Sequence, residues 1–183
     1  MDKPTIVNVA GKAQHGKDTF AQYLADYLYE EHKKKTQILH FADGVKLAAK
    51  RAGWDGEKDQ NGRVLLQFIG TEWGRNQIDK EVWIHKVRER IHSDSDVVIF
   101  PDTRFLNEIT YWIRKDYNVH PVKVARLDED GNEWDNGMSD KLKQHSSEIE
   151  IDNFPFPRII RHETLEQLQN QSKIFANGLV QDV

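Results

Sequence analysis

Cysteine is absent from this chain, which excludes disulfide bonds, thiolate nucleophiles and thiolate metal sites. No apolar run approaches the length that crossing a bilayer requires, so no membrane partner is expected. The N-terminus lacks the basic segment and long apolar core of a secretory signal, so a cytoplasmic location is the default expectation. A strong excess of positive charge is also missing. The formal net charge is −4, and nothing predicts a nucleic-acid partner.

Short apolar segments alternate with segments of helical periodicity along the 183 residues. The most apolar run, at 96–100, is typical of a central parallel strand buried on both faces. We predict strands at 5–10, 37–41, 96–100, 119–127 and 158–160, and helices at 18–35, 43–52, 107–115 and 163–175. Residues 53–62 predict a loop, and 63–92 predict one or two helices with a break near 70–74. This alternation predicts one α/β domain over residues 1–183 with a mainly parallel sheet.

A glycine-rich segment lies between the first predicted strand and the first predicted helix. It fits the pattern Gly-x-x-x-x-Gly-Lys, which cradles phosphates in this context. Loop N–H groups and the helix start direct positive dipoles into one concavity, and Lys17 adds a charge on the outer phosphates. Asp18 replaces the usual serine or threonine. The predicted nucleotide-binding residues are Gly11, Lys12, Ala13, Gln14, His15, Gly16, Lys17, Asp18 and Thr19; the alternative is an ordinary strand–helix turn.

A second motif, Phe-Pro-Asp-Thr-Arg at 100–104, follows the predicted central strand. Ligands of open α/β sheets bind at the carboxyl ends of the strands, so Asp102 is expected to face the glycine loop. A carboxylate there can hold a water bound to Mg²⁺, and Arg104 can reach phosphoryl oxygens. The alternative is that Asp102 caps a helix and Arg104 is a surface cation.

Aromatic residues and an arginine gather in the middle of the chain. Arg75 lies among apolar and aromatic residues, which makes it a candidate for a bidentate phosphate contact. Trp73 and Trp83 can stack on a base, although tryptophans at such spacing more often belong to the core. Asp79 lies between them and completes this candidate site.

The segment 128–147 is polar, rich in turn signals and carries both acids and lysines. A lid over reacting phosphates needs cations and mobility, so this segment and the residues just after it predict a lid. Its candidate substrate contacts are Lys141, His145 and Glu148, and the alternative for each is an ordinary surface charge. The eight histidines show no paired metal-ligand spacing, so we predict no zinc site.

These motifs together resemble the phage-type deoxynucleoside monophosphate kinases. The resemblance rests on Gly-Lys-Asp-Thr at 16–19, Pro-Asp-Thr-Arg at 101–104 and Phe-Ile-Gly-Thr-Glu at 68–72 with Asn76, Asp79 and Trp83. It extends to His-Ser-Ser-Glu at 145–148. The related animal phosphomevalonate kinases share the Gly-Lys-Asp loop and the Asp-Thr-Arg strand end.

The resemblance implies the nucleoside monophosphate kinase fold: a three-layer P-loop core with a parallel sheet flanked by helices, a helical acceptor-binding region at about 43–92, and a lid. It also implies ATP as donor, Mg²⁺ as metal and a nucleoside monophosphate as acceptor. Related proteins are often dimers, so a homodimer is one expected arrangement. By motif, the catalytic residues are Lys17, Arg104, Asp102 and Arg75, the metal residues are Asp18 and Asp102, and the acceptor contacts include Asp43 and Lys46.

Three functions remain open at this point. The first is phosphoryl transfer from ATP to a deoxynucleoside monophosphate in the cytoplasm, or in the host cytoplasm for a phage protein. The second keeps the kinase chemistry but uses another phosphorylated metabolite, such as phosphomevalonate. The third is a P-loop ATPase switch that acts on a protein partner. Such switches usually carry serine or threonine after the loop lysine, which disfavours this reading.

Overall fold

The computed structural model describes residues 3–135, 137, 139 and 143–181. Its centre is a five-stranded, wholly parallel sheet with the strand order β2-β3-β1-β4-β5. The strands are β1 (Thr5–Ala10), β2 (Thr36–Ile38), β3 (Val97–Phe100), β4 (Val119–Arg126) and β5 (Arg158–His162). The predicted α/β class with a parallel sheet is confirmed.

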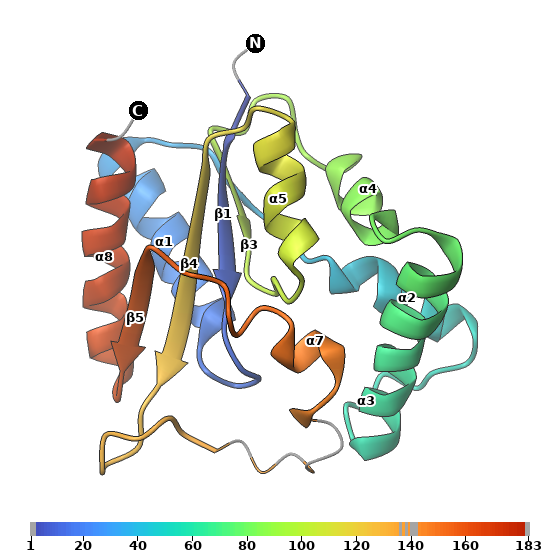
Figure 1. Cartoon of the computed structure of the whole chain (residues 1–183). Coiled ribbons are helices and arrows are strands. Elements are labelled where there is room, and N and C mark those ends of the chain that lie inside the picture. The colour runs from blue at the N-terminus through green and yellow to red at the C-terminus, as the bar shows by residue number, and fades with distance from the viewer. Residues whose placement is uncertain (1–2, 136, 138, 140–142, 182–183) are drawn as a thin grey trace.

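Helices cover both faces of this sheet, as the crossovers between parallel strands require. They are α1 (Lys17–His32), α2 (Ala42–Arg51), α3 (Gln60–Gln67), the π-helix η1 (Phe68–Ile78), α4 (Val82–Arg88), α5 (Leu106–Arg114), the short α7 (Ser146–Ile149) and α8 (Leu165–Gln181). In Figure 1, α1 and α8 lie side by side on one side of the sheet, whereas α2, α3 and α4 gather on the other side.

The strands send alternate side chains into two separate cores. In β3, Val97 and Ile99 pack with α1 and α8, whereas Val98 and Phe100 pack with α2, α4 and α5. This division follows from the two-residue period of a strand. Because both faces are covered, every residue of β1 and β3 is buried. β3 is a continuous apolar run, whereas β1 also contains Thr5 and Asn8, whose side-chain amide donates to Thr103 and to the carbonyl of Glu108. No helix among the described residues combines the length and apolar character of a membrane span.

The second strand is shorter than the predicted 37–41 and ends at Ile38. The reason is a distant carboxylate. Asp102, at the end of β3, accepts hydrogen bonds from the N–H groups of Phe41 (3.1 Å) and Ala42 (2.8 Å). These groups therefore begin α2 instead of continuing the strand.

The predicted helix break near 70–74 is wrong. The chain continues through this segment as the π-helix η1, which joins α3 without an interruption. The glycines serve packing. A Cβ atom on Gly74 would lie 2.6 Å from the ring of Trp83, and one on Gly44 would lie 2.9 Å from the same ring. They admit the tryptophan close to the backbone and do not end the helix.

Other helix ends also differ from prediction. The last helix runs from Leu165 to Gln181 and not from 163 to 175. The first helix stops at His32 and not at residue 35, because Lys33 adopts a left-handed conformation with φ of 53°. The helix following the loop starts at Gln60, where the Asp59 side chain caps it by accepting from the N–H of Gly62 at 2.7 Å.

Candidate active site

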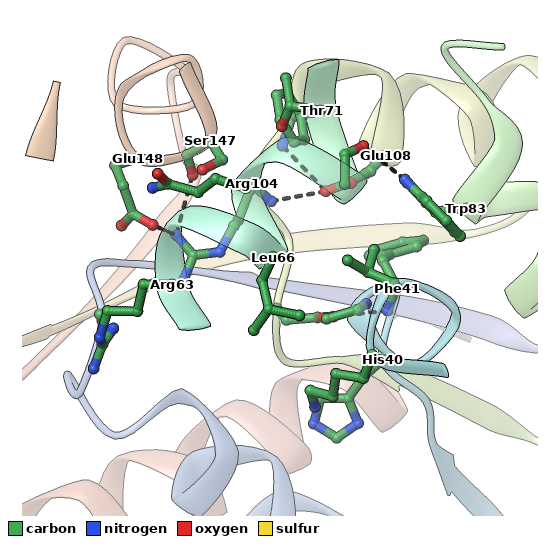
Figure 2. Close-up of a pocket in the computed structure, with 18 of the residues that line it drawn as sticks. His40, Phe41, Arg63, Leu66, Thr71, Trp83, Arg104, Glu108, Ser147 and Glu148 are labelled. Carbon is green, nitrogen blue, oxygen red and sulfur yellow. Dashed lines mark hydrogen bonds and ion pairs between the residues drawn. The ribbon is translucent and has the colours of Figure 1, made fainter. Parts of the chain in front are cut away.

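The carboxyl ends of the strands surround a cavity of about 450 Å³. Its lining comes from several parts of the chain (Figure 2). These are the glycine loop with the start of α1, the segment after β2 with α2, the helices α3, η1 and α4, the segment after β3 with α5, and α7. Six lysine and arginine side chains line it, together with four carboxylates: Lys17, Lys46, Lys58, Arg63, Arg75 and Arg104, with Asp18, Asp102, Glu108 and Glu148. The volume suits a small-molecule ligand, and the excess of cations suits an anionic one.

The glycine loop leaves the start of α1 open toward this cavity. Gly16, the N-cap residue, has φ of 85° and no side chain caps the helix. The N–H groups of the first turn of this 16-residue helix are therefore available to an anion. Gly11 allows the loop to pass close to β4, since a Cβ atom there would lie 2.2 Å from the Val124 carbonyl oxygen.

His15 turns its side chain away from the cavity and fixes the loop to the neighbouring segments. Its Nδ1 accepts from the N–H of Arg126 (3.2 Å), so its Nε2 carries the proton and donates to the carbonyl of Trp134 (3.0 Å). Burial lowers the pKa of His15, which favours this neutral form. His15 thus keeps its ring out of the cavity, and its carbonyl oxygen contacts Nε2 of His162 at 3.0 Å.

Lys17 is buried at the bottom of the cavity. Its Nζ donates to the carbonyl oxygen of Lys12 at 2.7 Å. Desolvation by burial, followed by the charge of Arg104, lowers the pKa of Lys17 to about 8. Lys12 itself points elsewhere, because its Nζ lies 2.9 Å from the Glu133 carboxylate and the residue does not line this cavity. The loop thus offers one lysine to the ligand.

The glycine-loop motif predicts ATP as a ligand, and Lys17 should make that binding pH-dependent. Bound phosphates favour the charged ammonium, so the pKa of Lys17, about 8 in the free protein, should rise in a complex. Below about pH 8, Lys17 is already protonated in the free protein, so ATP should bind with its full affinity. Above it binding must take up a proton, so the association constant falls, approaching about tenfold per pH unit.

Titrations of ATP between about pH 7 and about pH 9.5 measure this fall. The Lys17→Arg variant is the control, because a guanidinium stays charged across this range and gives a flat profile. An equal fall in both proteins would show that another group is responsible.

Asp18 and Asp102 both line the cavity, as their predicted metal role requires. Asp18 Oδ1 lies 2.8 Å from Nε2 of His40, and this contact lowers the pKa of Asp18 and raises that of His40. Asp102 is held by the two backbone N–H groups at the start of α2, and burial raises its pKa. Among the described residues, no group of three or more histidine, cysteine or acidic residues is arranged to hold a metal.

This donor set fits Mg²⁺. Carboxylate oxygens are ligands that Mg²⁺ accepts, and in phosphoryl-transfer sites the ion is bound by one or two carboxylates, with phosphate oxygens and water as the other ligands. Asp18, whose side chain is 78% exposed, has an oxygen that His40 does not contact. A metal role for Asp18 and Asp102 stays a prediction that the donor chemistry supports.

Arg104 meets α7 across the cavity. One of its Nη atoms donates to the carbonyl oxygen of Ser147 at 3.1 Å and to the carboxylate of Glu148 (Figure 2). Glu148, a predicted substrate contact, therefore partners a predicted catalytic arginine. His145 lies outside the cavity lining, and its Nε2 contacts Glu72 Oε1 on η1 at 3.0 Å.

Arg75 is buried on η1 and points into the same cavity. Its guanidinium lies flat over the ring of Phe105 at 3.7 Å, contacts Glu108 at 3.4 Å and donates to the side chain of Asn107. Desolvation lowers its pKa, but an arginine stays charged at any physiological pH. The structure thus brings Arg75 and Arg104 to one cavity with Lys17, as the motifs predict.

The other predicted substrate contacts divide into two groups. Lys46 and Trp83 line the cavity, with Trp83 only 7% exposed and its Nε1 donating to the Gly70 carbonyl at 2.8 Å. Asp43, Trp73 and Asp79 do not line it. Asp43 instead pairs with Arg90 at 2.9 Å, and Trp73 is 44% exposed. Lys141 lies outside the described residues. Thr19 is half-buried on α1 and does not line the cavity.

Several cavity residues escaped prediction. His40 lies two residues after β2 ends but inside the strand predicted at 37–41, so the strand-end rule did not identify it. Glu108 lies on α5, where the signal was a glutamate three residues after an N-cap position. Arg63 and Thr71 come from α3 and η1, where only the tertiary packing decides which side faces the cavity.

Comparisons with known proteins support the fold. No protein family model matches the chain, and none of the curated proteins matches its sequence. A gluconokinase structure from Sinorhizobium meliloti 1021 superimposes with a TM-score of 0.56 at 12% identity, covering 100% of this chain and 97% of that one. An APS kinase structure from Mycobacterium tuberculosis gives a TM-score of 0.46 at 12% identity, covering 97% of this chain and 99% of that one.

The chain therefore has a P-loop kinase-like α/β fold, with the five-stranded sheet order described above. At 12% identity, the likeness to the gluconokinase concerns the fold alone. The substrate has to be inferred from the residues of the cavity.

Proposed function

We propose that this protein is a small-molecule kinase that transfers the terminal phosphoryl group of ATP to a deoxynucleoside monophosphate. The observation that carries the proposal is one cavity in which Lys17 of the glycine loop faces Arg104 and Arg75. The glycine loop suits the donor phosphates, and the two arginines suit an acceptor that is itself a phosphate.

The cavity has apolar as well as charged lining. Phe41, Val45 and Leu66 line it, and Arg75 lies over the ring of Phe105. An apolar and aromatic wall next to a cationic one fits an acceptor with a flat base and a phosphate. The resemblance at 68–72 and 145–148 favours a deoxynucleoside monophosphate. The Gly-Lys-Asp loop and the Asp-Thr-Arg strand end do not distinguish this acceptor, because phosphomevalonate kinases share them.

The chemistry needs no general base. The acceptor's phosphate oxygen is already ionised; it attacks the terminal phosphorus of ATP, the bond to the bridging oxygen breaks, and ADP leaves with that oxygen. The task of the protein is to align donor and acceptor, neutralise charge and exclude water. Lys17 holds the donor phosphates, while Arg104 and Arg75 bind the acceptor phosphate. When bound, Mg²⁺ supplies charge neutralisation on the donor phosphates, with Asp18 and Asp102 as its protein ligands, directly or through water.

The test is a panel of all common ribo- and deoxyribonucleoside monophosphates with ATP and Mg²⁺, read out as ADP release and as product formation. We expect at least one deoxynucleoside monophosphate to raise ADP release on the order of 100-fold above hydrolysis alone. Phosphorylated metabolites without a base form the second arm. Activity only on phosphorylated metabolites without a base would show that the acceptor is such a metabolite and not a deoxynucleoside monophosphate. Hydrolysis that responds only to an added protein would favour a switch.

A further inference from the structure

Glu108 is an unexpected residue in a cavity proposed for phosphates. It is a carboxylate, only 3% exposed, and it lies on α5 facing the cavity. A buried acid repels an anionic ligand unless its charge is compensated. Its position therefore needs a specific explanation.

One oxygen of Glu108 caps a helix. Oε2 accepts from the N–H of Arg104 at 2.8 Å and from the N–H of Phe105 at 3.1 Å, at the start of α5. This is the reach of a capping-box residue back to the N-cap. Glutamine performs the same task, because only a carbonyl-type oxygen is needed. Capping alone does not explain a negative charge at this position.

The other oxygen faces Arg75. Oε1 lies 3.4 Å from Nη1 of Arg75, whose guanidinium is itself only 7% exposed and stacked on Phe105. Burial raises the pKa of Glu108 to about 7, and the charge of Arg75 acts in the opposite direction. One carboxyl group therefore connects the backbone of Arg104, just before α5, with the guanidinium of Arg75 on η1.

We propose that Glu108 is a positioning residue that sets Arg75 relative to Arg104, so that both guanidinium groups meet one acceptor phosphate. The proposal rests on the proposed function, because it assumes an acceptor phosphate at these arginines. Two arginines on different elements reach one phosphate only if the elements keep a fixed distance. A group buried between them, bonded to both, provides that constraint. The substrate does not touch Glu108; it touches the arginines.

The experiment compares Glu108→Gln with Glu150→Gln. Glutamine keeps the cap and removes only the charge facing Arg75. Glu150 also accepts an N–H bond at the start of α5, from Leu106 at 3.1 Å, but no bond joins it to Arg75. We expect Glu108→Gln to raise the KM for the acceptor about tenfold and to change the dissociation constant of ATP less than about twofold. Glu150→Gln should leave both values and the melting temperature unchanged.

A double-mutant cycle separates positioning from capping. In an Arg75→Ala background the carboxylate has no guanidinium to place, so Glu108→Gln should raise the acceptor KM less than about twofold further. If the tenfold effect persists in that background, or if ATP affinity falls in parallel, Glu108 acts only on the helix and the proposal is overturned.

A second readout is independent of the substrate. If the wild-type protein phosphorylates no monophosphate, the proposed function fails, and nitrogen-15 spectra of the arginine side chains then decide the positioning role. The Arg75 signal should shift and broaden in Glu108→Gln but not in Glu150→Gln. An unchanged Arg75 signal in Glu108→Gln would overturn the proposal.

Discussion

Replacing Lys17 by methionine should lower kcat/KM for phosphoryl transfer on the order of 1,000-fold or more, the largest change expected from any single substitution in the cavity. The ammonium group is the one cation that the glycine loop directs into the cavity, and it lies at the bottom, where water cannot replace it. Loss of a positioned charge from a desolvated phosphate site removes transition-state stabilisation as well as binding.

The same substitution should leave the fold intact. Methionine has a similar length, and the wild-type side chain makes one hydrogen bond, to the Lys12 carbonyl. The pKa of about 8 shows that burial already disfavours the charged lysine, so its removal should not reduce the melting temperature. Activity assays and thermal unfolding of the same preparation measure both effects.

Lys35→Met provides the matched control. It makes the same chemical change at a surface residue whose Nζ pairs with Asp94 at 2.9 Å, and an exposed pair of this kind contributes little to stability. Its activity should equal that of the wild type. Full transferase activity in Lys17→Met would refute the role assigned to the glycine loop.

The sheet could be predicted because its signals are local. Each buried strand of a parallel sheet is a short apolar run, and the glycine loop lies between a strand and a helix in the sequence itself. The end of β2 could not be predicted in this way. It is set by Asp102, about sixty residues further along the chain, whose carboxylate takes the N–H groups that would extend the strand.

The same distinction applies to the cavity. Lys17, Asp102 and Arg104 were predictable because they follow strands, and strand ends meet at one edge of the sheet. Trp73 was a weaker inference: helical spacing says that a residue lies on one side of a helix, but it does not say which side. In η1, Thr71 and Arg75 are four residues apart and line the cavity, whereas Trp73, two residues from each, lies outside it.

Trp83 tests the two interpretations that the sequence left open, base stacking and core packing. Its ring fits between Gly44 and Gly74, its Nε1 donates to the Gly70 carbonyl at 2.8 Å, and 7% of the residue is exposed. The ring thus joins α2, η1 and α4, the helices that form one wall of the cavity.

Trp83→Ala should therefore lower the free energy of unfolding by about 3–5 kcal/mol, as other buried large-to-alanine substitutions do. Urea denaturation at constant m-value measures the loss. The control is Trp73→Ala on η1, where 44% of the side chain is exposed and the change should stay within about 0.5 kcal/mol.

The comparison discriminates between the two interpretations because each predicts a different pair of results. If Trp83 served only to stack on a base, its alanine variant would keep its stability and lose acceptor affinity alone. A large loss of stability, with the Trp73 variant unchanged, assigns the ring to the packing of the cavity wall. The two glycines then have a physical reason, since any Cβ atom there would occupy the space that the ring fills.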